Sequence, residues 1–137
     1  MGTWDSTSFG NDTACDWSYG LAEVNDLTYV EAALDRVLDG GAGTLLAADV
    51  AECAVAASEV VARLRGNWGD ESPYTESADQ WVRSHSTRPP APLVAKAVAA
   101  LDRVVTGPSE LLDLWAESGG EVQWTGAVSE LRERVQR

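Results

Sequence analysis

The chain has 137 residues, 45% of them hydrophobic, and a formal net charge of −12. Its length predicts a single domain over residues 1–137, and its apolar content excludes a largely disordered chain. The negative charge disfavours nucleic acid and anionic membrane surfaces as partners, because both repel carboxylates.

The charge is distributed unevenly along the chain. Residues 1–60 hold eleven carboxylates and one base, Arg36, for a balance of −10. Residues 61–137 hold eleven carboxylates and nine bases, for −2. This acidic half either attracts basic proteins or cations, or serves only solubility.

The residue usage indicates a reducing compartment. Two cysteines, Cys15 and Cys53, are too few for a small secreted domain stapled by disulfides. No basic stretch followed by an apolar run opens the chain, and no apolar run is long enough to cross a bilayer. Nine of the ten basic residues are arginine, as is common in GC-rich bacteria. We therefore expect a bacterial, cytoplasmic protein that does not bind membranes.

The hydrophobic periodicity is helical nearly throughout, and it predicts an all-α, compact bundle of about six to seven helices. The first helix is expected over residues 12–24, with Asn11 or Asp12 as its N-cap. The second follows Thr28 and stops at the glycine-rich residues 40–43.

A long central helix is expected over about 44–65. It is apolar nearly all round and rich in alanine, which is typical of a helix in the middle of a bundle. The proline-rich residues 86–92 are interpreted as a stiff corner within one domain. Four shorter helices are expected after the central one: one following Thr75, one starting at Pro92, one starting near Ser109 and one carrying Trp124.

The sequence lacks the usual motifs of enzymes and metal proteins. With one histidine, His85, and neither Cys-x-x-Cys nor His-Glu-x-x-His, it has no standard zinc site. It also lacks a di-iron motif, a calcium loop, a phosphate loop, a dinucleotide fingerprint and a nucleophile elbow. We therefore expect no catalytic residue and no cofactor. The alternative is an enzyme or metal-dependent protein that uses a carboxylate cluster of Asp12, Asp16, Glu52 and Glu59.

Glu52 and Glu59 lie two turns apart on one face of the expected central helix. If they are buried, each needs hydrogen bonds or a counter-charge. Arg63 is one turn from Glu59 and is its expected partner. Backbone amides of the opening segment are the expected partners of Glu52. Alternatively, both glutamates belong to a solvent-facing strip with Asp49.

Trp68 stands between Asn67 and Gly69 in an expected loop. An exposed indole there would indicate a contact site for a partner. The alternative is a ring that folds back over the core.

The opening, MGTWDSTSFGNDTACDW, resembles the start of the bacterial family DUF4259, whose members begin with a Trp-Gly-x-Gly-x-Phe-x-Asn-Asp-x-Ala-x-Asp-Trp pattern. Asp5 and Thr7 stand where that family usually has glycine. The alanine-rich stretch with Glu52 and Glu59, and SELLDLWAESGG followed by Trp124, are also similar to the family. The resemblance implies a small helical domain and no particular reaction. The positions that match the opening pattern are Trp4, Phe9, Asn11, Asp12, Ala14, Asp16 and Trp17.

These observations predict that the opening segment lies as an extended strap across the bundle. Trp4 and Phe9 would be buried in it, and Asn11 and Asp12 would close the start of the first helix.

The leading functional hypothesis is a small, acidic, non-enzymatic module that binds a basic protein. A sharper version is an immunity or inhibitor protein that covers the active site of a basic toxin or nuclease. The carboxylate-dependent enzyme is the alternative, and self-association is a third possibility. The sequence leaves the oligomeric state open.

Overall fold

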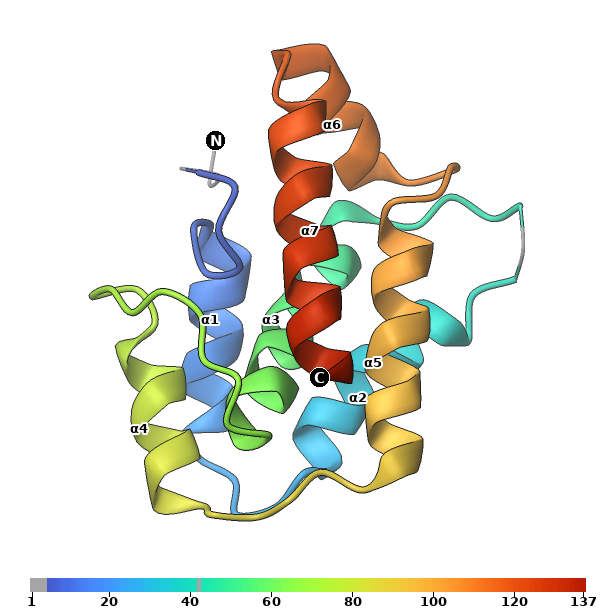
Figure 1. Ribbon diagram of the computed structural model, residues 1–137. Helices are drawn as coiled ribbons and strands as arrows, with labels where there is room; N and C mark the ends of the chain where they lie inside the picture. The colour runs from blue at the N-terminus through green and yellow to red at the C-terminus, as the bar shows by residue number, and fades with distance from the viewer. Residues whose placement is uncertain (1–4, 42) are drawn as a thin grey trace.

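The computed structural model describes residues 5–41 and 43–137. These residues form seven helices, and no strand occurs among them (Figure 1). The prediction of an all-α bundle is therefore confirmed. None of the helices in these two ranges is long and apolar enough to pass through a bilayer. The helices are α1 (Asp12–Leu21), α2 (Thr28–Leu38), α3 (Ala48–Leu64), α4 (Glu76–Ser84), α5 (Ala91–Val104), α6 (Glu110–Ser118) and α7 (Glu121–Gln136).

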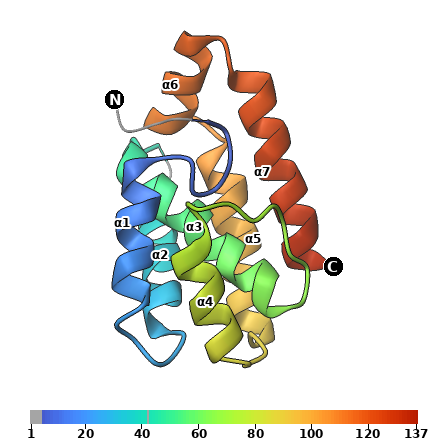
Figure 2. The same ribbon diagram turned by 90° about the vertical axis from the view of Figure 1, so that its left-hand side faces the viewer.

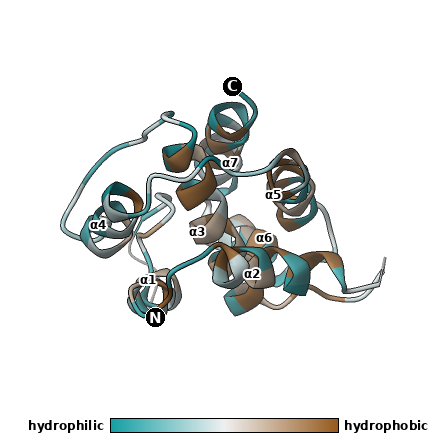
Figure 3. Ribbon diagram, turned by 90° about the horizontal axis from the view of Figure 1, so that it is seen from below, coloured by the Kyte–Doolittle hydropathy of each residue, from teal (hydrophilic) through white to brown (hydrophobic). Residues whose placement is uncertain are grey.

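Helix α3 occupies the centre and contacts each of the other six helices. Figure 3 shows it between α1 and α4 on one side and α2 and α5 on the other. Every residue from 54 to 63 is buried. Alanine supplies many of these positions, and its small side chain lets the surrounding helices approach closely. The alanine-rich pattern thus correctly predicts a buried central helix.

Helix α3 begins at Ala48, so the expected start at residue 44 is wrong. The backbone of Leu46 pairs instead with the segment at the start of α6. Its N–H donates to the Pro108 carbonyl at 3.1 Å, and its carbonyl accepts from the Glu110 N–H at 2.9 Å. The Glu110 side chain also accepts from the Ala48 N–H at 2.7 Å, which satisfies a free amide at the start of the helix. A residue paired with a distant segment in this way cannot continue a helix.

Helix α1 starts as expected and ends early. The Asn11 side chain accepts a hydrogen bond from the Ala14 N–H at 2.7 Å, so Asn11 is the N-cap. The helix stops at Leu21 and not at Val24. The Val24 carbonyl instead accepts from the indole N–H of Trp81 at 2.9 Å, which anchors the turn after α1 to α4.

The hydrophobic core draws on all seven helices and includes residues from both sides of the proline-rich segment. Trp17, Trp81 and Trp124 are buried in it. Trp115 stacks on Trp124, with ring centroids 6.4 Å apart. This stack lies in the α6–α7 hairpin, which extends beyond the rest of the bundle (Figure 2).

Candidate functional site

The opening segment forms a closed turn at residues 5–10. The Asp5 N–H donates to the Gly10 carbonyl at 3.2 Å, and the Asp5 carboxylate accepts from the Thr7 N–H at 2.8 Å. The expected extended strap is therefore wrong for these residues, because the Asp5 carboxylate bonds to the backbone two residues further on and the chain turns back. Phe9 is 1% exposed, so its expected burial is confirmed. Trp4 lies outside the described residues.

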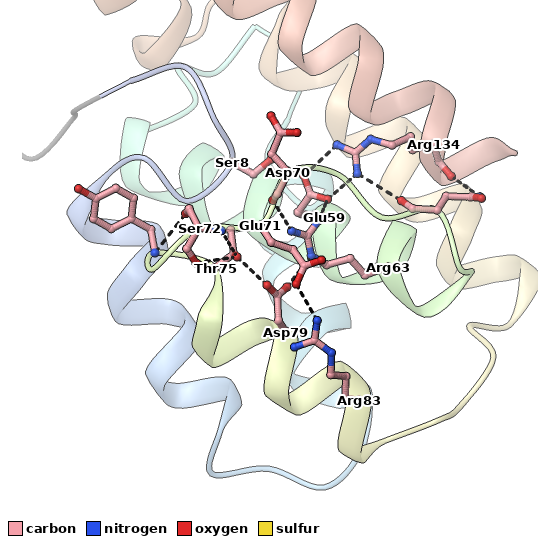
Figure 4. A network of polar contacts seen from close by, with 12 residues as sticks. Ser8, Glu59, Arg63, Asp70, Glu71, Ser72, Thr75, Asp79, Arg83 and Arg134 are labelled. Atoms are coloured by element: carbon pink, nitrogen blue, oxygen red, sulfur yellow. Dashed lines mark hydrogen bonds and ion pairs between the residues drawn. The ribbon is translucent and has the colours of Figure 1, made fainter.

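Below this turn lies a buried group of four charged residues, which we call the Glu59 cluster: Glu59, Arg63, Asp79 and Arg134. Two guanidinium nitrogens of Arg134 donate to the two Glu59 carboxylate oxygens, at 2.6 and 3.0 Å (Figure 4). Arg63 Nη1 and Ser8 Oγ donate to the same carboxylate, at 2.5 and 2.9 Å. Four donors thus hold one buried carboxylate. Of the two alternatives left open by the sequence, the structure has the one in which Glu59 is buried, and the expected pairing with Arg63 is confirmed.

Arg63 connects Glu59 to helix α4 and to the loop before it. Its Nε donates to Asp79 at 2.7 Å, and its Nη2 donates to the Asp70 carbonyl at 2.7 Å. Asp79 also accepts from Thr75 Oγ1 at 2.6 Å. Two guanidiniums and two carboxylates balance to zero charge, which is the arrangement in which buried ions are tolerated.

The cluster keeps Glu59 ionised. Burial by itself would raise the pKa of Glu59, but the hydrogen bond from Arg134 and the positive charges of Arg63 and Arg134 outweigh burial and lower it. The pKa of Arg134 is raised despite burial, because Glu59 and Glu130 stabilise its charged form. A carboxylate held so firmly in its charged form is a weak general base. The cluster is therefore suited to joining α3, α4, α7 and the opening turn, and not to proton transfer.

A cavity of about 420 Å³ lies against the cluster, between the opening turn, residues 68–70 and α7. Its size is within the usual range for small ligands, roughly 300–1,000 Å³. Its two guanidiniums, however, are already neutralised by Glu59 and Asp79. Gly69 packs directly on one of them, since a Cβ there would lie 2.8 Å from the guanidinium carbon of Arg134.

Trp68 is half-buried beside this cavity and packs against the core. The guanidinium carbons of Arg63 and Arg83 lie 5.1 and 5.0 Å from the centre of its indole ring. At these distances cations interact favourably with an aromatic face. Its position matches the alternative in which the ring folds back over the core, and a role in partner binding stays a prediction.

The four carboxylates considered as metal ligands are not brought together. Asp12 and Asp16 are exposed on α1, whereas Glu52 and Glu59 are buried on α3. No group of three or more histidine, cysteine, aspartate or glutamate side chains that could hold a metal ion occurs in the described part of the chain.

Glu52 faces the opening turn. It is 8% exposed and borders a small gap together with Thr7, Ser8 and Asn11. Its bonding to backbone amides of the opening segment stays a prediction. Since Glu52 and Glu59 are both buried and only Asp49 is exposed, the alternative of one solvent-facing strip is wrong.

Three exposed residues of α1 form what we call the acidic face: Asp12, Asp16 and Tyr19. Asp5, before the helix, and Glu23, after it, are also exposed. Asp12, Asp16 and Tyr19 follow a spacing of four and three residues, which keeps them on one side of the helix. Tyr19 is 63% exposed. Within the described residues, none of these carboxylates has an ion-pair partner.

The two thiols are free, with Cys15 buried and Cys53 half-buried. Burial raises the pKa of Cys53 to about 11. Burial and the nearby Asp12 and Asp16 also raise the pKa of Cys15. Protonated thiols are poor nucleophiles, so these side chains suit packing better than covalent chemistry.

Sequence reasoning missed Asp79, Arg134 and Ser8. Asp79 and Arg134 lie at the edges of the apolar stripes of α4 and α7, each three residues from a buried apolar residue, Val82 and Leu131. A charged residue so close to a buried stripe is the signal that could have identified them. Nothing in the pattern around Ser8 distinguishes it from other polar residues.

Comparisons with known proteins identify the family of this chain. No curated protein and no solved structure matches the chain. A family model described as a domain of unknown function, DUF4259, matches residues 2–127. That match spans almost the whole sequence, and the chain therefore belongs to the DUF4259 family.

Proposed function

We propose that this protein is a small, non-enzymatic binding module whose acidic face receives a basic surface of a partner protein. The main support is that Asp12 and Asp16 are exposed on one side of α1, next to an exposed Tyr19. Carboxylates without an internal counter-ion retain their full charge for a partner. Tyrosine is common among the residues that contribute most to interfaces, because its ring offers a large contact area at a small entropic cost.

The contrast with the interior supports the same proposal. The Glu59 cluster is neutral overall, so the excess negative charge lies outside it. The acidic face is also held in shape, since Asn11 caps α1 and Ser8 ties the opening turn to Glu59. A preorganised surface loses less entropy when it binds.

An immunity or inhibitor protein is the specific form that we favour. Opposite charges on the two partners would speed their association, which suits a protein that must capture a toxin quickly. Bacterial origin and a cytoplasmic location are parts of this proposal.

Carbodiimide crosslinking in a lysate of the source cells tests the proposal, because this reagent joins a carboxylate to a nearby lysine. We expect mass spectrometry to find Asp12 or Asp16 joined to one lysine-rich protein, with the yield falling as salt rises. The double variant Asp12→Lys/Asp16→Lys should lose this product. Its matched control is Asp113→Lys/Glu117→Lys, which makes the same charge change at the same spacing on exposed positions of α6.

Equal loss of the product in both double variants would show that net charge, and not the acidic face, governs binding. A protein that gives no salt-sensitive product at all would contradict the proposal. Thermal unfolding with magnesium, manganese or calcium addresses the carboxylate-dependent alternative, since a bound ion raises the unfolding temperature.

A further inference from the structure

A groove of about 400 Å³ lies between the C-terminal ends of α3 and α4 and the segment after α4. Four arginines line it, and its lining includes no aspartate or glutamate. The molecule has only ten lysine and arginine residues and a net charge of −12, so four arginines in one groove are unusual, although two of them pair with carboxylates outside the lining. We propose that the groove binds a small phosphorylated molecule. Its four arginines are Arg63, Arg65, Arg83 and Arg88.

Two of these arginines have donors to offer. Arg65 donates from Nη2 to the Arg137 carbonyl at 2.6 Å, but its Nε is buried and has no hydrogen-bond partner. A buried N–H without an acceptor is unfavourable, so a small movement of the side chain that brings Nε to a phosphate oxygen would be favoured. Arg88 is exposed, and no ion pair engages it within the described residues.

A third arginine is held in place and can exchange its partner. Arg83 pairs with Glu71 at 2.6 Å, and both side chains are more than half exposed. Exposed ion pairs contribute little to stability, so a ligand oxygen can replace Glu71. The guanidinium also lies over the Trp68 ring, which limits the orientations of its planar fork.

The donor set matches a phosphate group. Arginine donates two parallel N–H bonds to phosphate oxygens, and hydroxyl groups can donate further bonds. The hydroxyl residues Ser86 and Thr87 line the same groove. Arg63 contributes to the wall, but Glu59 and Asp79 already neutralise it.

The ligand is a small molecule and not a nucleic acid. The groove volume lies within the range of small-ligand sites, roughly 300–1,000 Å³. A polyanion would extend beyond the arginines and meet a protein of net charge −12, which repels it. A single phosphate group meets mainly the arginines. The proposal does not depend on the acidic face.

Calorimetric titration with inorganic phosphate, and separately with phenyl phosphate, tests the groove at constant ionic strength. The unmodified protein should bind at least one probe saturably. Arg88→Ala and Arg83→Ala should each weaken binding by about tenfold or more, the loss expected for one charged hydrogen bond. Arg36→Ala is the matched control, because Arg36 is an exposed arginine on α2, outside the groove lining. It should leave the affinity unchanged.

Three results would overturn the proposal. One is the absence of saturable binding by either probe. Another is an equal loss of affinity in Arg36→Ala and Arg88→Ala, which would indicate a general charge effect. The last is binding of an oligonucleotide with neither phosphate probe bound.

Discussion

Replacement of Glu59 by glutamine tests the physical role of the Glu59 cluster. The change keeps the size of the side chain and removes its charge. Arg63 and Arg134, which are 2% and 7% exposed, would then share Asp79 and the exposed Glu130 as their carboxylate partners. Removal of one partner from a buried ion pair costs about 3–5 kcal/mol, because the other charge stays buried without compensation. Proteins of this kind have a total stability of about 5–15 kcal/mol, so we expect a folded but strongly destabilised variant.

Urea unfolding, followed by tryptophan fluorescence, measures this loss. The free energy of unfolding falls by about 1–3 kcal/mol per molar urea in small proteins. With a slope of about 2 kcal/mol per molar, a loss of 4 kcal/mol lowers the midpoint by about 2 M. The slope itself should not change, since the same surface is exposed on unfolding.

The matched control is Glu130→Gln. Glu130 pairs with the same arginine, Arg134, at 2.6 Å, but its side chain is 57% exposed. Exposed pairs contribute about 0–1 kcal/mol, so its midpoint should shift little. If Glu59→Gln and Glu130→Gln shift the midpoint equally, the argument from burial is refuted.

Three further predictions concern pH, packing and thiol chemistry. Because the pKa of Glu59 is lowered in the fold, its stabilising contribution is complete above its ordinary pKa of 4.5 and is lost as pH falls through the folded value. The free energy of unfolding in urea should therefore differ less between pH 7 and pH 3 in Glu59→Gln than in the unmodified protein. Gly69→Ala should lower the free energy of unfolding by about 1–3 kcal/mol, because its Cβ would displace an Arg134 guanidinium that Glu59 holds in place. Gly126→Ala, where a Cβ would meet nothing within 4 Å, should be neutral or stabilising in the same assay. With a pKa of about 11, Cys53 should react with iodoacetamide at pH 7.5 far more slowly in the folded protein than in urea, and equal rates would contradict its burial.

Several features could be predicted because they depend on neighbours along the chain. The alanine-rich run indicates a buried α3, and Asn11 is recognisable as a cap from its position before an apolar stripe. Glu59 and Arg63 are one helical turn apart, which is the range over which a sequence reports side-chain contacts.

Other features depend on segments that are far apart in the sequence. The bidentate pair of Glu59 with Arg134 joins residues 75 positions apart. The start of α3 depends on the backbone pairing of Leu46 with the segment before α6. No local pattern encodes these partners, because they follow from how the helices pack.

The sequence by itself thus determined the helical class, the central helix and the acidic balance, since these follow from the local order of apolar and charged residues. Only the tertiary structure decided that Glu59 lies in a neutral buried cluster, that Asp12 and Asp16 face outward and that four arginines share one groove. The physical reason is that burial and the meeting of distant charges are properties of packed surfaces, which arise only when the helices are assembled.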